Sequence, residues 1–186
     1  MYLTKMHRAI QCDLAESISH LTVHLPPTRL MKWEQGIYTI TDQPEQLDIE
    51  LIHRFLSTES YWAKDIPKAI VVRSIEHALC FGLFREQQQI GFGRVITDRA
   101  TFAYLSDVFV LPSHRGEGLG KWLVECILRH PDLQGLRRWM LATGDAHGLY
   151  QQFGFALSEP GILMQKVNPE TYHPVAEAHP ANDTFE

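Results

Sequence analysis

The 186-residue sequence has few of the features that mark several large classes of protein. Its three cysteines, Cys12, Cys80 and Cys126, lie far apart and form no Cys-x-x-Cys pair, which argues against a disulfide scaffold or a zinc ribbon. No run approaches the roughly 18 consecutive apolar residues of a membrane span, and no apolar stretch follows Lys5 and Arg8 as in a signal peptide. We therefore expect a cytoplasmic protein with no membrane partner and no bound metal.

Positive charge is scarce as well. Lysine and arginine number 17 against 22 aspartates and glutamates, which gives a net charge of −5. Proteins that bind nucleic acid usually carry a basic excess, so we expect no nucleic-acid partner. Apolar residues make up 45% of the chain and charged residues 21%, which is typical of one globular domain with its own core.

Apolar periodicity predicts helices and strands in alternating groups. Helices are expected at 47–56, 67–77, 118–130 and 146–153. Strands are expected at 36–41, 79–84, 89–97, 102–111, 139–142, 155–158 and 162–167, the last two as a hairpin around Pro160-Gly161. This order predicts an α+β sandwich, with a mixed, mostly antiparallel central sheet flanked by helices.

The chain is expected to divide into three parts. Residues 1–31 form an N-terminal arm with a helix near 5–22, because apolar residues recur there at helical spacing before Pro26-Pro27. Residues 32–168 form the compact domain. Residues 169–186 form a flexible tail, because they are polar and have no apolar period.

A glycine-rich segment between the strand 102–111 and the helix 118–130 is the strongest local signal. It reads Arg115-Gly-Glu-Gly-Leu-Gly120, and its open backbone amides at a helix N-terminus suit a phosphate group. A Walker A loop is excluded, because Arg115 stands where its first glycine is required and Trp122 where it needs serine or threonine. The dinucleotide pattern also fails, because its third glycine would fall at Lys121 or Leu123.

With Val-Leu-Pro shortly before it, this segment resembles the acetyl-CoA-binding motif of the GNAT superfamily of N-acetyltransferases. A second segment, Ala146-His-Gly-Leu-Tyr150-Gln-Gln-Phe-Gly154-Phe155, resembles that family's later motif A-x-x-L-Y-x-x-x-G-F. The resemblance covers about residues 36–167. It implies the GNAT-like acyl-CoA N-acyltransferase fold, with acetyl-CoA as the acyl donor.

The resemblance also implies roles in binding acetyl-CoA. Backbone groups of Phe109 and Val110 would pair with the pantetheine arm, and Lys121 would add counter-charge together with Arg115. The amides that would hold the pyrophosphate belong to Arg115, Gly116, Glu117, Gly118, Leu119 and Gly120. Thr143 stands where the family often has an asparagine whose side chain contacts the cofactor. Its hydroxyl can still donate one hydrogen bond there.

Acetyl transfer to an amine needs help with two protons. An alkyl amine is only about 0.1% neutral at pH 7, so a base is useful. Asp107, an acid within an apolar strand, is the candidate base, and the alternative is an ion pair or turn contact at that strand. By the resemblance, Tyr150 would face the departing sulfur and donate a hydrogen bond to the developing thiolate. His114 and His147 are expected nearby.

The acceptor is the least determined part. Tyr61 and Trp62 lie in a loop that often walls the acceptor site in the family, where they would bind an aromatic or cationic amine, unless they cap the core. The sequence thus predicts an N-acetyltransferase acting on a small-molecule primary amine. The alternatives are acetylation of a protein or peptide, or a non-catalytic CoA-binding sensor. Family members often pair through their sheets, which allows a homodimer.

Overall fold

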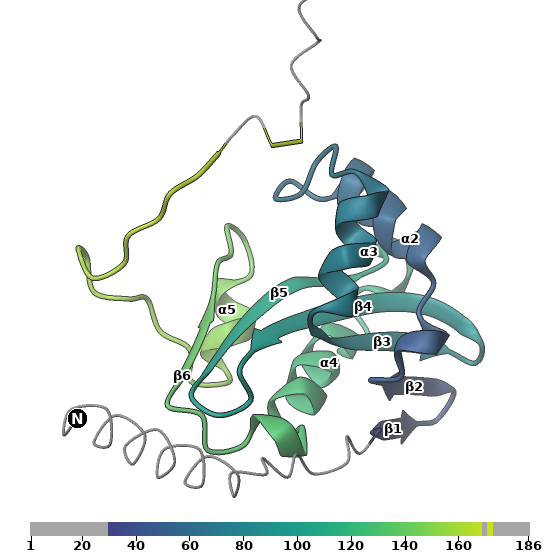
Figure 1. The fold of residues 1–186 in the computed structure, drawn as a ribbon. Helices are drawn as coiled ribbons and strands as arrows, with labels where there is room; N and C mark the ends of the chain where they lie inside the picture. Colours follow the sequence, from purple (N-terminus) through teal and green to yellow (C-terminus); the bar gives the residue numbers. More distant parts are fainter. Residues whose placement is uncertain (1–29, 169–170, 173–186) are drawn as a thin grey trace, which may run out of the picture.

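A computed structural model describes residues 30–168 and 171–172, and its centre is one six-stranded sheet (Figure 1). The strands lie side by side in their sequence order. Neighbouring strands from β1 to β5 are antiparallel, and β5 and β6 are parallel. The strands are β1 (Lys32–Gln35), β2 (Tyr38–Thr41), β3 (Leu79–Arg85), β4 (Gln88–Thr97), β5 (Phe102–Val110) and β6 (Arg138–Leu141). The expected mixed, mostly antiparallel sheet is confirmed.

Helices cover both faces of the sheet and bury two cores (Figure 1). The first core packs α4 (Leu119–Leu128) against one face, and the second packs α2 (Ile49–Arg54) and α3 (Lys68–Glu76) against the other. A fourth helix, α5 (His147–Gln151), lies beside β6. A π-helical turn at Phe55–Glu59 extends α2, and 3-10 turns occupy Pro44–Gln46, Pro112–His114 and Pro131–Leu133.

A β-bulge interrupts the regular alternation of β5. Asp107 and Val108 of this strand lie opposite the single residue Gly93 of β4. Asp107 has a φ of 55°, a value that side-chain-bearing residues seldom adopt. Leu105 belongs to the core under α4 and Phe109 to the core under α2 and α3, although strict alternation would put both on one face. The bulge therefore reverses the faces of the sheet to which the side chains at the end of β5 point.

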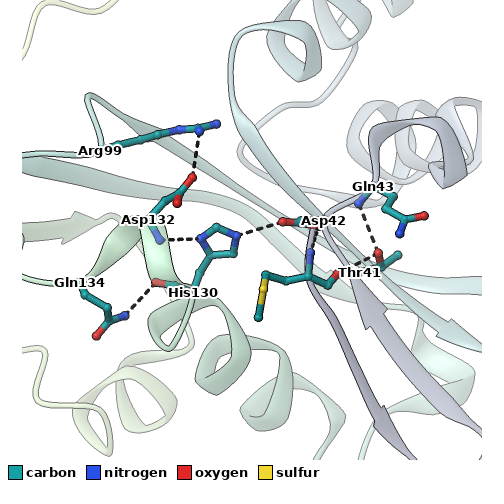
Figure 2. A network of polar contacts seen from close by, with 8 residues as sticks. Thr41, Asp42, Gln43, Arg99, His130, Asp132 and Gln134 are labelled. Atoms are coloured by element: carbon teal, nitrogen blue, oxygen red, sulfur yellow. Dashed lines mark hydrogen bonds and ion pairs between the residues drawn. The ribbon is translucent and has the colours of Figure 1, made fainter. Parts of the chain in front are cut away.

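A fully buried histidine–aspartate pair joins the N-terminal strands to the end of α4 (Figure 2). His130 Nε2 lies 2.9 Å from Asp42 Oδ2, and the side chains are 0% and 1% exposed. His130 Nδ1 accepts the Asp132 backbone N–H at 3.2 Å, so the ring proton resides on Nε2 and is donated to Asp42. The second carboxylate oxygen of Asp42 accepts the Met31 backbone N–H at 2.7 Å.

Two parts of the sequence-based expectation are wrong. Residues 155–168 contain no strand, so the closing hairpin around Pro160-Gly161 is absent from the part of the chain that the structure describes. The backbone instead turns at Gly154, with a φ of 85°, and the Phe155 N–H donates to the Tyr150 carbonyl oxygen at 3.3 Å. The sequence pattern also misses β1, a short edge strand whose charged residues hide its period.

The division of the chain remains a prediction at both ends. The expected helix near 5–22 and most of the expected tail at 169–186 lie outside the described residues. Met31, which the sequence pattern places in the arm, is joined to the domain by backbone and side-chain hydrogen bonds with Thr41 and Asp42.

Candidate functional site

The central feature of the site is the gap that opens where β5 and β6 separate. The two strands pair over four residues only, ending at Leu105 with Leu141. Beyond this point β5 continues to Val110, whereas the chain after Leu141 turns toward α5. A cavity of about 410 Å³ lies there. Its walls include five residues singled out from the sequence: Tyr61, Trp62, Asp107, Thr143 and Tyr150.

Asp107 enters this cavity at the bulge in β5, and both of its oxygens have partners. Arg94 donates to Oδ2 through Nε and Nη2, each at 2.7 Å, and Trp62 Nε1 donates to Oδ1 at 3.2 Å. The Arg94 and Asp107 side chains are 14% and 9% exposed. A carboxylate has about four lone-pair positions, so Asp107 retains capacity to accept a further hydrogen bond from a ligand.

The Tyr61–Trp62 pair forms a strap across the cavity. Trp62 contacts β5 through Asp107, and the Tyr61 hydroxyl accepts the Gly144 backbone N–H at 2.7 Å on the opposite wall. The two rings pack edge to face with centroids 5.0 Å apart. Both side chains remain exposed, at 61% and 42%, which is inconsistent with a role in capping the core. The strap therefore joins the walls of the gap over its opening.

Tyr150 is buried, with 9% of its surface exposed. It lines the cavity between β5 and β6 and also a second cavity on the outer side of β6. Burial, reinforced by the nearby negative charge of Asp145, raises the pKa of Tyr150 from 10.0 to about 12. The phenol is therefore protonated throughout the physiological range and able to donate a hydrogen bond.

Thr143 organises the turn that leads into α5. Its Oγ1 accepts the Ala146 backbone N–H at 3.0 Å and lies 3.4 Å from both the backbone nitrogen and a carboxylate oxygen of Asp145. The hydroxyl is thus already used in a local turn of the kind that serine and threonine favour before a helix.

The glycine loop lies at the N-terminus of α4 and lines neither cavity. Gly116 and Gly118 have φ values of 86° and 79°, and no atom lies within 4 Å of where a Cβ would stand on either. Gly118 precedes the first turn of a ten-residue helix, whose leading amides have no partner within the helix. The Glu117 carboxylate accepts a hydrogen bond from the Tyr38 hydroxyl at 2.6 Å.

The residues expected to bind pantetheine are only partly free to do so. The Phe109 carbonyl oxygen lies against β4, since a Cβ on Gly91 would stand 2.8 Å from it, and the Phe109 ring stacks on Phe55 at 3.8 Å. The Val110 carbonyl oxygen accepts from Arg115 Nε at 2.9 Å. Arg115 is therefore held beside the loop, while Lys121 projects into solvent.

Comparison with known proteins identifies the family. A family model described as "Acetyltransferase (GNAT) domain" matches residues 76–157. A Gibberella zeae protein, named a putative acetyltransferase, is 34% identical over 145 residues, which cover 66% of this chain and 81% of that protein. A crystal structure of a putative acetyltransferase of the GNAT family from Xanthomonas campestris pv. campestris is 52% identical, with a TM-score of 0.72, and the match covers 75% of this chain and 99% of that one. The chain belongs to the GNAT family of acetyltransferases.

GNAT membership makes this protein an acyltransferase of a family that uses acetyl-CoA. The fold is also shared with a GNAT acetyltransferase from Elizabethkingia anophelis that was crystallised with acetyl-CoA bound; it is 14% identical, with a TM-score of 0.52, and the match covers 67% of this chain and 80% of that one. Within residues 30–168 and 171–172, no group of three or more His, Cys, Asp or Glu side chains is arranged to hold a metal ion. No helix in the same part of the chain is long and apolar enough to cross a membrane.

Sequence reasoning misses two partners within this GNAT site. Arg94, which neutralises Asp107, and Gly144, which binds Tyr61, carry no recognisable motif. Gly91 and Gly93 give a usable signal, because glycines inside a strand often mark a bulge or a close backbone approach. Gly144 lies against the Tyr61 ring, since a Cβ on Gly144 would stand only 3.1 Å from the Tyr61 hydroxyl oxygen. This contact spans 83 residues of sequence, and no local pattern reveals it.

Proposed function

We propose that this protein transfers an acetyl group from acetyl-CoA to the primary amine of a small molecule in the cavity between β5 and β6. The observation that supports this best is the cavity itself. It is lined by a paired carboxylate, Asp107, and a buried protonated phenol, Tyr150, together with the Tyr61–Trp62 strap. A cavity bounded in this way suits a small acceptor better than an extended peptide, which needs an open groove.

The glycine loop fits the pyrophosphate of acetyl-CoA. The positive φ values of Gly116 and Gly118 expose amides, and the space where their side chains would stand is open. The N-terminus of α4 adds partial positive charge, and Arg115 and Lys121 supply full charges within an acidic protein. The Tyr38 hydrogen bond holds the Glu117 carboxylate to one side, which lessens its repulsion of a bound anion.

The pantetheine arm would lie along the end of β5, with Phe109 and Val110 and the Thr143 turn beside it. The thioester of acetyl-CoA supplies an activated acyl group and a thiolate leaving group. Asp107 would bind the acceptor ammonium and receive its proton, directly or through water, while Arg94 keeps the carboxylate oriented. The strap would stack against an aromatic or cationic acceptor through Tyr61 and Trp62.

Tyr150 would donate a hydrogen bond to the developing thiolate rather than give up its proton. With a phenol pKa of about 12 and a thiol pKa near 8.5, full transfer is uphill by about 5 kcal/mol. A fixed donor in a buried site still stabilises negative charge at sulfur, and solvent then supplies the proton.

Tyr150→Phe is expected to lower kcat by about tenfold or more while acetyl-CoA binding persists, because the donor is lost but the ring still packs. Thiol release with an amine found by screening measures kcat. Thermal unfolding with excess acetyl-CoA measures binding, with about 2.7 kcal/mol of added stability expected at 100 times Kd. Tyr104→Phe is the matched control, because Tyr104 lines the same cavity. An unchanged kcat in Tyr150→Phe would remove the proposed role, and intact binding without turnover on any amine would point to a CoA-binding sensor.

Asp107→Asn is expected to lower kcat by about tenfold or more, with the KM for acetyl-CoA unchanged. The amide keeps an oxygen for Trp62 but cannot accept the proton of the amine. Asp145→Asn, in the same cavity, is the control. If Arg94→Met lowers kcat by as much as Asp107→Asn does, Asp107 serves the ion pair alone.

A further inference from the structure

The cavity between β5 and β6 has one wall that comes from the end of the chain. Tyr172 lines this cavity together with Asp107, Tyr150 and the Tyr61–Trp62 strap. Its side chain is half-buried. Residues 171–172 belong to the stretch that the sequence pattern predicts to be a tail, so the sequence alone assigns them no role in the site.

A turn brings the chain back to the cavity. The segment 155–168 leaves α5 in a wide arc, and residues 171–172 then lie near the loop that joins α2 to α3 (Figure 1). Thr171 donates its backbone N–H at 3.4 Å and its hydroxyl at 3.0 Å to the Asn168 carbonyl oxygen. A hydrogen bond between residues three apart is typical of a β-turn, so the chain changes direction just before Tyr172.

Tyr172 packs against an apolar surface that faces the same cavity. Its side chain contacts the core beneath α2 and α3. Ala63 and Ile66 belong to that core, Ile70 packs against it, and all three line the cavity. Tyr172 therefore extends the apolar wall of the cavity and does more than cover the outside of the core.

The charged and apolar walls of the cavity come from different elements. Strands β4 and β5 contribute the ion pair of Arg94 with Asp107. The apolar wall comes from α3, from the loop before it and from Tyr172. A ligand with an amine at one end and an apolar body at the other is complementary to this arrangement. Its amine would reach Asp107 while its body leaves water for the apolar wall.

We propose that Tyr172 is a substrate-binding residue of this acetyltransferase, and that it selects primary amines carrying an apolar body such as a ring or a branched chain. The inference rests on the proposed function, because it takes Asp107 as the site of the amine. Tyr61 and Trp62 are held by hydrogen bonds to Gly144 and Asp107, whereas Tyr172 is placed by its packing on the core. The affinity that Tyr172 adds therefore grows with the apolar surface of the acceptor.

Calorimetric titration tests this selection without turnover, because CoA in place of acetyl-CoA leaves no group to transfer. The full-length chain is saturated with CoA and titrated with 2-phenylethylamine, 3-methylbutylamine and ethylamine. The wild type is expected to bind the first two at least about thirtyfold more tightly than ethylamine, since burying about 80 Å² more apolar surface gives a factor of this size. Tyr172→Ala is expected to reduce that preference at least about fivefold, the effect of uncovering about 40 Å². Tyr172→Phe keeps the ring and should keep the preference.

Met164→Ala is the matched control. Met164 lies in the segment that leads to Tyr172, is 97% exposed and lines neither cavity. A wild type that does not prefer the two larger amines would overturn the proposal. The same holds if Tyr172→Ala weakens the binding of ethylamine as much as that of 2-phenylethylamine, or if Met164→Ala has the same effect as Tyr172→Ala.

Thiol release with acetyl-CoA and the same amines separates this inference from the proposed function. Tyr172→Ala is expected to raise the KM for 2-phenylethylamine at least about fivefold, with kcat and the KM for acetyl-CoA changed by no more than about twofold. A fall in kcat with every amine would instead show a structural role and overturn the inference. A wild type that binds the larger amines and acetylates none of them would contradict acetyl transfer to this class of amine, while Tyr172 would remain a residue that binds it.

Discussion

Replacing Gly118 with valine is expected to lower the affinity for acetyl-CoA at least about a hundredfold. Gly118 has a φ of 79°, where a β-branched residue is strained, and its missing side chain leaves open the space at the N-terminus of α4. A valine would displace the loop amides or occupy the position of the pyrophosphate. Losing two charge-assisted hydrogen bonds, each contributing about 1.5–3 kcal/mol, accounts for a loss of this size. Calorimetric titration with acetyl-CoA measures it.

Gly135→Val separates this effect from simple strain. Gly135 has a φ of 74° and equally open surroundings, but it lies in the turn before β6, away from the loop. Both variants should lose similar stability in the absence of ligand, and only Gly118→Val should lose the thermal shift with acetyl-CoA. If Gly118→Val keeps the wild-type affinity, the loop is a tight turn between strand and helix and the pyrophosphate binds elsewhere.

His130→Ala is expected to lower the free energy of unfolding by about 3–5 kcal/mol, because it removes a fully buried ring and a hydrogen-bond donor to a buried carboxylate. The imidazole is fully buried and donates to Asp42. Its ring centroid lies 5.6 Å from that of Phe81 and 6.2 Å from that of Trp33. Its removal leaves a cavity as well as a carboxylate with one fewer donor. Chemical denaturation followed by intrinsic fluorescence gives the free energy directly.

The neighbouring residue provides the control. Arg129 pairs with Glu125 at 2.9 Å on the surface of α4, and its side chain is 74% exposed. Arg129→Ala should therefore change the free energy of unfolding by no more than about 0.5 kcal/mol. Equal effects of the two substitutions would show that the buried pair does not hold the N-terminal strands to α4.

The sequence predicts the parts of this fold that depend on local pattern. The hairpin of β3 and β4 is recognisable from two apolar runs around a polar turn, and α4 from its apolar face before Pro131. The same reasoning fails for residues 155–167, where the composition suits strands but the segment pairs with no strand of the described chain. A strand needs both its own pattern and a partner with which it pairs, and only the first is visible in the sequence.

The sequence predicts several of the residues that form the candidate site, but not which of them contact one another. The resemblance to the GNAT motifs implies Tyr150, the composition of the glycine loop indicates a phosphate site, and Asp107 is conspicuous as an acid in an apolar strand. The Arg94 ion pair and the Tyr61 hydrogen bond to Gly144 arise only when strands and loops distant in the chain meet. Their geometry depends on the register between β4 and β5, which a bulge alters and which no residue pattern within one strand specifies.

That bulge makes position 107 matter in two separable ways. As the extra residue of the bulge, Asp107 determines to which face of the sheet each later side chain of β5 points. Leu105 and Phe109 point to opposite faces only because of it. As a side chain, Asp107 is free to serve the cavity. Substituting Asp107 changes the chemistry of the cavity and keeps the number of residues in β5. Deleting it would turn the side chains of Val108, Phe109 and Val110 to the opposite faces of the sheet. Because φ at this position is 55°, residues that tolerate the left-handed region, such as asparagine and glycine, can replace Asp107 without altering the strand, whereas losing the position would alter it.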